Sequence, residues 1–244
     1  YYYKLFSYDG VGYSPGVTVN ATTLCEPISV FPWTEGFETV TIPALPQCWF
    51  EDPASGGWVT TNNANSTNDA DARSGAQFLR ESWLATDEYI WSPGFQLAAG
   101  TSYDFSFWWA GDDYAGWTGD VFYNTLQSSV GATQLGTSFV TNGEVTTKTY
   151  QQEIYQFTPS LAGTYYFAIR VNCPTSTPWY LSFDDFSFQT TPTTPVFSIS
   201  PASKNFGSIY VGSSSANQTF TLTNIGAGTL TITAGNISII GADA

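Results

Sequence analysis

The segment Tyr103-Asp-Phe-Ser-Phe-Trp-Trp109 decides the fold class, because large apolar side chains alternate with polar ones along it. Tyr103, Phe105, Phe107 and Trp109 share one face of an extended chain, since successive side chains of a strand point to opposite sides. A period of two over seven residues predicts a β-strand with one face in a core.

The same alternation continues outward from this segment in both directions. It recurs in Val121–Thr125, Tyr165–Val171, Trp179–Phe183 and Thr219–Thr223. Turn signals separate the strands, at Asp9-Gly10, Ser55–Gly57, Asn142-Gly143, Ala162-Gly163 and Gly226–Gly228. No window carries a convincing helical stripe. The sequence therefore predicts an all-β chain built of antiparallel sandwiches.

The composition is typical of a secreted β-protein. Charged residues make up 11% of the 244 residues, against about 25% in an average protein, and aromatic residues make up 17%. The net charge of −14 disfavours nucleic acid and anionic membrane surfaces as partners. The many carboxylates suit a hard cation such as Ca²⁺, although solubility alone also accounts for most of them.

Several site classes are excluded by residues that the chain lacks. It has no histidine, which removes Ser-His-Asp and Cys-His nucleophile systems and His-ligated zinc. Its three cysteines, Cys25, Cys48 and Cys173, show no CxxC spacing. No apolar run approaches the ~18 residues that span a bilayer, so membrane insertion is not expected.

The chain divides at two places. Thr190–Pro195 is a Thr/Pro linker, because its prolines remove ladder donors and favour an extended chain. A less sharp boundary lies near Cys25–Pro27. The segments outside these boundaries are shorter than domains, so we expect the chain to be a window on a longer multidomain protein.

Three pieces resemble known families. Residues 1–27 resemble the last two strands of a fibronectin type III domain, carried by Tyr1–Tyr8 and Ser14–Thr23. Residues 28–189 resemble the MAM-like jelly rolls of the cleaved-adhesin and choice-of-anchor groups, and residues 196–244 resemble the start of an ASH-type immunoglobulin-like domain. The jelly-roll motifs are Phe31–Glu38, Pro46–Trp49, Trp58, Arg73–Gly75, Tyr89–Pro93, Phe95–Gly100 and Tyr180–Phe186. Those of the last piece are Phe197–Pro201, Phe206–Gly212 and Phe220–Leu230.

The resemblance implies an antiparallel jelly-roll sandwich flanked by partial immunoglobulin-like and fibronectin-like sandwiches. It also implies a cell-surface or secreted bacterial protein, often exported by type IX secretion, whose modules adhere or act as spacers without catalysis.

The resemblance also implies a structural calcium site. In related jelly rolls a glutamate of the first strand and an aspartate of the last share a cation, and here these are Glu38 and Asp184, with Asp185 as second choice. Asp69 and Asp71 are candidates for further ligands. Flanking phenylalanines would desolvate these acids, and a divalent cation would offset that cost. The alternative is that Glu38 and Asp184 are hydrogen-bonded or pair with an arginine.

The best candidate for ligand binding is the loop Gly111–Asp120. It displays Tyr114 and Trp117 among acids that include Asp112 and Asp113, and Trp108 adds an aromatic ring on the outward face of its strand. Aromatic rings take the C–H faces of sugars and acids take their hydroxyls. The alternative is that Trp117 folds back as a lid on the core.

The acidic doublets do not suggest a glycosidase. Such enzymes need two acids about 5 to 10 Å apart across a cleft, whereas neighbours on a strand point to opposite faces. We therefore expect no enzyme activity.

A disulfide between Cys25 and Cys48 is implied by the resemblance, since MAM-like domains join cysteines at about these places. Cys48 as a buried thiol, or Cys173 as a partner of either cysteine, remains open.

The expected function is a non-catalytic adhesin or stalk module on the cell surface. Its partners would be a host or matrix glycan or protein, or neighbouring domains of the same long chain. Two rivals are a carbohydrate-binding module of a secreted hydrolase and a filament subunit completed by strand addition from neighbours.

Overall fold

The structure is a computed structural model. It describes residues 2–20, 25–53, 56–62, 70–83, 85–173, 175, 178–201, 204, 206–208, 210, 212–233 and 235. The chain divides into two compact units, Tyr1–Gln189 and Thr190–Ala244, with the division at the start of the Thr/Pro linker. Among the described residues no helix is long and apolar enough to cross a membrane.

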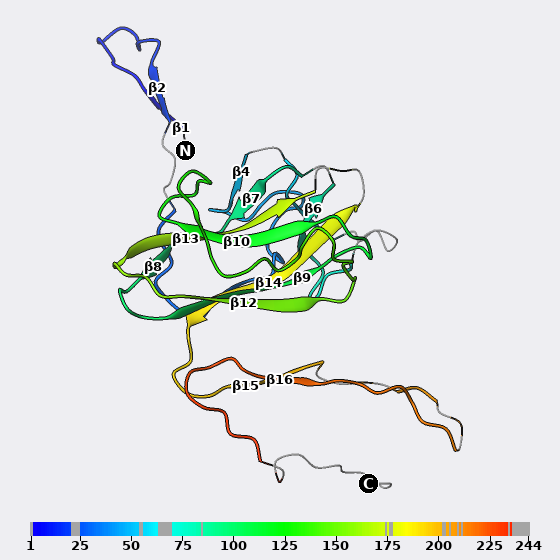
Figure 1. Cartoon of the computed structure of the whole chain (residues 1–244). Helices are drawn as coiled ribbons and strands as arrows, with labels where there is room; N and C mark the ends of the chain where they lie inside the picture. The colour runs from blue at the N-terminus through cyan, green and yellow to red at the C-terminus, as the bar shows by residue number, and fades with distance from the viewer. Residues whose placement is uncertain are drawn as a thin grey trace. The chain divides into compact units, whose positions relative to one another are not determined.

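Two sheets built from the middle of the chain carry the fold (Figure 1). Their strands are β3 (Trp33–Glu35), β4 (Phe50–Asp52), β5 (Val59–Thr61), β6 (Phe78–Ser82), β7 (Glu88–Trp91), β8 (Phe95–Leu97), β9 (Tyr103–Ala110), β10 (Thr118–Asn124), β11 (Thr133–Gln134), β12 (Gln151–Phe157), β13 (Gly163–Asn172) and β14 (Tyr180–Thr190).

Each sheet has six strands, and the two stack face to face. The first sheet has the order β11-β10-β13-β7-β4, with β8 also paired to β13. The second has the order β12-β9-β14-β6-β5, with β3 also paired to β14. Pairs such as β10–β13 and β9–β12 are antiparallel. The predicted all-β, antiparallel jelly-roll sandwich is confirmed.

The core is aromatic and lies between the sheets. Phe105, Phe107 and Trp109 of β9 are at most 1% exposed, as the alternation in their segment predicted. Rings from opposite sheets meet directly, since the Phe105 and Phe167 ring centroids lie 5.3 Å apart. Such contacts add about 0.5–1.5 kcal/mol per pair to the free energy of area burial.

A bulge interrupts β14 in the middle of the second sheet. The φ angle of Asp185 is 47°, a left-handed conformation that a non-glycine residue seldom adopts. Before this point β14 pairs with β6, at Tyr180–Phe183, and after it β14 pairs with β3, at Phe186–Phe188. The bulge therefore marks the place where one neighbouring strand gives way to the next.

Short hairpins occupy the two end segments. β1 (Tyr2–Leu5) pairs antiparallel with β2 (Val17–Asn20), and β15 (Phe197–Ser200) pairs antiparallel with β16 (Thr221–Asn224). The fibronectin-like and immunoglobulin-like assignments of these segments stay predictions.

Candidate functional site

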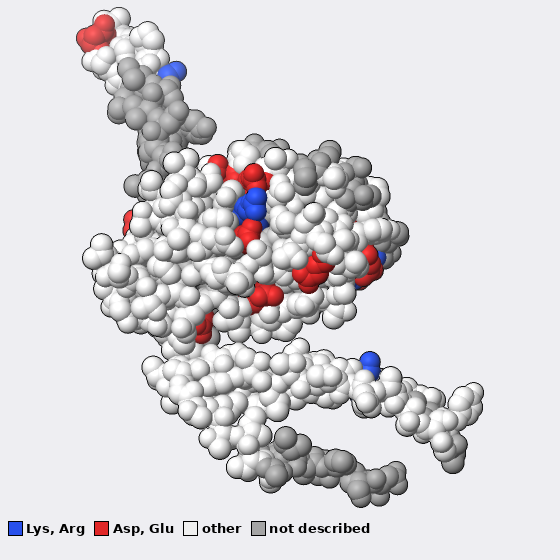
Figure 2. All heavy atoms as spheres, in the orientation of Figure 1, with Lys and Arg blue, Asp and Glu red and all other residues white. Residues whose placement is uncertain are grey.

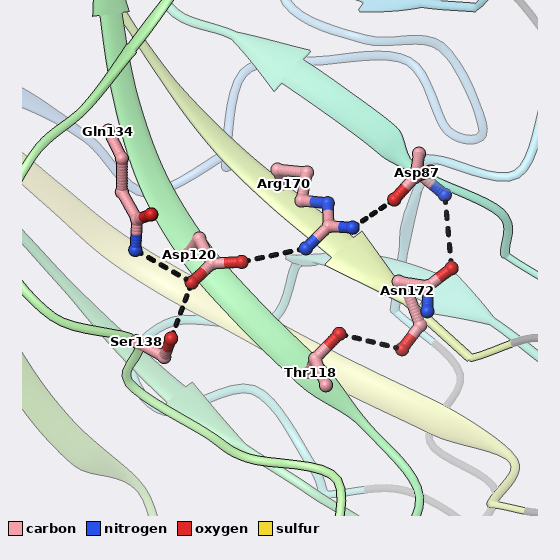
Figure 3. Close-up of polar contacts among 7 residues, drawn as sticks. All are labelled: Asp87, Thr118, Asp120, Gln134, Ser138, Arg170 and Asn172. Carbon is pink, nitrogen blue, oxygen red and sulfur yellow. Dashed lines mark hydrogen bonds and ion pairs between the residues drawn. The ribbon is translucent and has the colours of Figure 1, made fainter.

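The outer face of the first sheet carries a polar cluster centred on Arg170 (Figure 3). On β13 the residues Phe167, Ile169 and Val171 point into the core and are fully buried. Arg170 lies between them in sequence and therefore points to the other side, where its side chain is 23% exposed. The cluster is thus built on a central strand, which is a rigid support.

Strand register places partners on both sides of Arg170. Asp120 of β10 and Tyr89 of β7 are its cross-strand neighbours. Its Nη1 donates to Asp120 Oδ2 at 2.8 Å, and its Nη2 donates to Asp87 Oδ1. Burial opposes the charge of Arg170, but the hydrogen bonds to these two carboxylates outweigh it, so the pKa of the guanidinium is raised.

The carboxylate of Asp120 is itself held in place. Its Oδ1 accepts hydrogen bonds from Ser138 Oγ at 2.5 Å and from Gln134 Nε2 at 3.0 Å. At the other end, the backbone N–H of Asp87 donates to Asn172 Oδ1 at 3.3 Å. At least four neighbouring segments therefore hold the side chains of the Arg170 cluster in place.

Aromatic rings lie beside this cluster. The ring of Tyr89, which is partly exposed, is 5.4 Å from that of Phe122 and 6.1 Å from that of Trp91, between centroids. Register places Phe122 and Trp91 on either side of Ala168, with Phe50 beyond Trp91. Phe50 is 46% exposed, whereas Trp91 is fully buried.

Charge is sparse on the visible side of the sandwich (Figure 2). In the region of β7 and β10 a basic patch lies between acidic ones, with uncharged surface around it (Figure 2). Asp87 and Asp120 outnumber Arg170 in the cluster, so this face disfavours anionic ligands. We call the Arg170 cluster together with Tyr89 and Phe122 the β13 face.

Sequence reasoning did not select the β13 face. A signal was present, because Asp120 and Arg170 are charged residues at outward positions of strongly apolar strands. The sequence did not reveal that β10, β13 and β7 are neighbours, which is what brings these residues together.

The ligand loop expected at Gly111–Asp120 needs a correction. Trp117 is fully buried in the core. It therefore folds back as a lid on the core, which was the alternative to a ligand-binding role. Asp112 is also fully buried. Asp112 Oδ2 accepts hydrogen bonds from the backbone N–H groups of Trp179 and Tyr180. Burial raises the pKa of Asp112. These two side chains support the loop and offer no surface to a ligand.

The remaining candidates for ligand binding lie in the Gly111–Asp120 loop and on β9, and among the described residues no hydrogen bond, ion pair or ring contact joins them. Asp113 and Tyr114 are exposed in the loop, and Asp113 lies 4.0 Å from the ammonium group of Lys148. Trp108 is half-buried on the outer face of the second sheet, and the guanidinium of Arg73 lies 3.6 Å from its ring centroid. One face of this ring is thus already covered.

Asp184, the first expected calcium ligand, is fully buried and surrounded by donors. Its Oδ2 accepts from the backbone N–H groups of Arg73 and Ser74 at 2.9 and 3.1 Å, and its Oδ1 accepts from that of Asp185 at 2.7 Å. Burial raises the pKa of Asp184 to about 6 despite these donors. The carboxylate pins the segment after residue 72 against the bulge of β14.

Glu38 and Asp185 are engaged in a similar way. Glu38 Oε1 accepts from the backbone N–H groups of Ala76 and Gln77, both at 2.9 Å. Asp185 pairs with the guanidinium of Arg73 and accepts from Ser74 Oγ at 2.7 Å. Glu38 is thus hydrogen-bonded and Asp185 is paired with an arginine, which are the interactions named above as the alternative to a calcium site.

Calcium at Glu38 and Asp184 stays a prediction, which these donors do not favour. Asp71 is exposed, and Asp69 lies outside the described residues.

The structure places Cys25 and Cys48 in a disulfide, the pair that the resemblance implied, with Cα atoms 5.8 Å apart. Cys173 is a free, buried thiol. The bond ties the segment before the sandwich to the turn that precedes β4.

Comparisons with known proteins give a likeness of fold. No family model matches the chain, and no curated protein matches its sequence. Among solved structures, the K2 cleaved adhesin domain of Lys-gingipain is 18% identical, with a TM-score of 0.48 over 66% of this chain and 98% of that one. The K1 cleaved adhesin domain from Porphyromonas gingivalis W83 is 16% identical, with a TM-score of 0.44 over 66% and 99%.

A carbohydrate-binding module, TmCBM61 in complex with β-1,4-galactotriose, is also similar. It is 16% identical, with a TM-score of 0.42 over 64% of this chain and 94% of that one. At such identities the likeness transfers no residue role to this chain.

Proposed function

We propose that the sandwich is a non-catalytic binding module of an extracellular adhesin, and that its β13 face binds a hydroxyl-rich ligand, namely a glycan. The observation that carries the proposal is the guanidinium of Arg170, held between Asp87 and Asp120 beside the partly exposed ring of Tyr89.

The chemistry of this face suits a sugar. A fixed guanidinium donates in a planar fork, and a carboxylate beside it accepts, so neighbouring hydroxyls of one sugar find both kinds of partner. The rings of Tyr89 and Phe122 offer apolar area to the C–H face of the same sugar. Because strands hold Arg170, Asp120, Tyr89 and Phe122, and Asp87 directly precedes β7, little conformational freedom is lost on binding.

The extracellular setting is supported by two independent features. A disulfide such as Cys25–Cys48 persists in oxidising compartments. The low content of charged residues, 11%, fits a surface of hydroxyls and amides.

The first test is binding to soluble polysaccharides, measured by calorimetry. The panel includes xylan and β-1,4-galactan, and the variants are Tyr89→Ala and Arg170→Lys. Loss of an aromatic contact worth about 1–3 kcal/mol weakens binding roughly 5- to 150-fold. Arg170→Lys keeps the charge but loses the planar fork, so we expect weaker binding here too.

Two matched variants serve as controls. Tyr114→Ala removes an exposed tyrosine from the Gly111–Asp120 loop, and Arg80→Lys changes an arginine that lies 4.3 Å from the Tyr180 ring on the other sheet. Both should bind like the unchanged protein. Binding lost with Tyr114→Ala and kept with Tyr89→Ala would move the site to the loop. If no glycan binds, the module is better explained as a spacer. Release of reducing sugar would indicate an enzyme.

A further inference from the structure

Three glutamates meet between the two sheets, away from the β13 face. Glu51 of β4, Glu81 of β6 and Glu88 of β7 each offer a carboxylate oxygen, and these oxygens lie within 4.8 Å of one another. The three side chains are only 9%, 1% and 8% exposed. Their strands come from both sheets, since β4 and β7 belong to the first and β6 to the second.

The positions are ones where a sandwich normally buries apolar side chains. Glu51 is the cross-strand neighbour of Ile90, and Glu81 is that of Leu181; both neighbours are at most 1% exposed. Bringing three carboxylates into such a place is costly unless a positive charge or a proton compensates.

The surrounding backbone holds Glu51 as an acceptor. Its Oε1 accepts from the N–H groups of Gly57 and Trp58 at 2.8 and 3.2 Å, and its Oε2 accepts from that of Gly56 at 2.9 Å. A Cβ on Gly57 would lie 2.3 Å from Glu81 Oε1, so only glycine lets the turn close this tightly over the acids.

Glu81 supplies the observation that points to a ligand. Its Oε1 accepts from the N–H of Ser82 at 2.8 Å. Its Oε2 is buried and, within the described part of the chain, has no hydrogen-bond partner. Burial, together with Glu88 and Glu51, raises the pKa of Glu81 to about 9.

We propose that Glu51, Glu81 and Glu88 bind one calcium ion between the two sheets. All the donors are oxygens, which suits a hard cation. Oxygens on opposite sides of a calcium ion are about 4.6–5.2 Å apart, because each lies about 2.3–2.6 Å from it. The three carboxylate oxygens of the cluster lie within 4.8 Å of one another, so they can contact the same calcium ion. The ion would link β4 and β7 of one sheet to β6 of the other.

The site differs from the one expected at Glu38 and Asp184. There, N–H groups or a guanidinium engage the carboxylates, as described above. In the glutamate cluster, backbone N–H groups engage Glu51, but Glu81 Oε2 has no hydrogen-bond partner among the described residues, and three carboxylates lie together. A cation would stabilise this arrangement.

The test uses the full chain, first analysed for bound calcium by elemental analysis and then treated with chelator. Melting is recorded by circular dichroism with chelator and with millimolar calcium. At about a hundred times the dissociation constant, calcium should raise the melting temperature by roughly 5–10 °C. Terbium, bound in place of calcium, should luminesce when tryptophan is excited, because Trp58 adjoins Glu51.

Variants locate the ion. Glu81→Gln has the shape of the protonated side chain, so it should fold, and it should abolish both the calcium-dependent shift and the terbium signal. Glu88→Gln is a second variant in case the first is unstable. Glu38→Gln is the matched control and should keep both signals.

Three results would overturn the proposal. The first is that the protein carries no calcium and melts at the same temperature with chelator and with calcium. A proton on Glu81 would then compensate the buried charge in place of a cation. The second is a shift that persists in Glu81→Gln and Glu88→Gln. The third is a shift lost only in Glu38→Gln, which would place calcium at the other site.

Discussion

Replacing Trp117 by alanine should destabilise the sandwich rather than remove a binding surface. The indole is fully buried in the core, directly before β10. Truncation of a buried tryptophan to alanine costs about 3–5 kcal/mol, from lost transfer free energy and the cavity left behind. For a domain of this size each kcal/mol lowers the melting temperature by about 2–4 °C, so a drop of roughly 6–20 °C is expected.

A second substitution at this position tests the reasoning more finely. Trp117 Nε1 is buried with no hydrogen-bond partner among the described residues. Trp117→Phe leaves a cavity of roughly 40 Å³, which costs about 1 kcal/mol at ~24 cal/mol per Å³. It also removes a buried donor whose desolvation costs about 1–3 kcal/mol. The two effects nearly cancel, so this variant should melt within a few degrees of the unchanged protein.

The assay is calorimetric melting of both variants, combined with polysaccharide binding measured below the transition. Folded Trp117→Ala protein should bind as the unchanged protein does. The reasoning is refuted if Trp117→Ala melts within about 2 °C of the unchanged protein while losing glycan binding. That outcome would make Trp117 an exposed stacking surface.

Three further predictions concern stability. Reduction of the Cys25–Cys48 bond, which spans 23 residues, should cost about 3 kcal/mol in the loop-entropy model, and melts with and without reductant measure it; an unchanged melt would contradict this. The folded pKa of Asp184, about 6 against 3.8, means that the folded state holds its proton longer than the unfolded state. Stability should therefore fall by up to about 3 kcal/mol from pH 4 to pH 6.5, relative to Asp184→Asn, in denaturant titrations; parallel pH profiles would refute this. A chain ending at Gln189 should unfold cooperatively by near-ultraviolet circular dichroism, and loss of that signal would place the boundary elsewhere.

The alternation of side chains was sufficient to predict the strands of the core. Tyr103, Phe105, Phe107 and Trp109 were assigned to one face from their spacing, and all four are at most 4% exposed. This works because the period of a strand is a local property of the backbone.

The residues of the β13 face, where we propose binding, could not be predicted in the same way. The period does not give the order of strands in a sheet, and Arg170 meets Asp87 and Asp120 only because β13 lies between β7 and β10. The mixture of rings and acids in the Gly111–Asp120 loop suggested a ligand, but composition does not tell which way a loop side chain points. Trp117 turned inward because the interior offered its large apolar surface more contacts.

The sequence by itself determined the class of the fold, an all-β antiparallel sandwich, because alternation and turn residues act over a few neighbouring positions. Only the tertiary structure decided which acids meet. Glu51, Glu81 and Glu88 lie on three separate strands, and their oxygens approach within 4.8 Å only when the two sheets stack. Sites of this kind arise from contacts between residues distant in the chain, which no local pattern records.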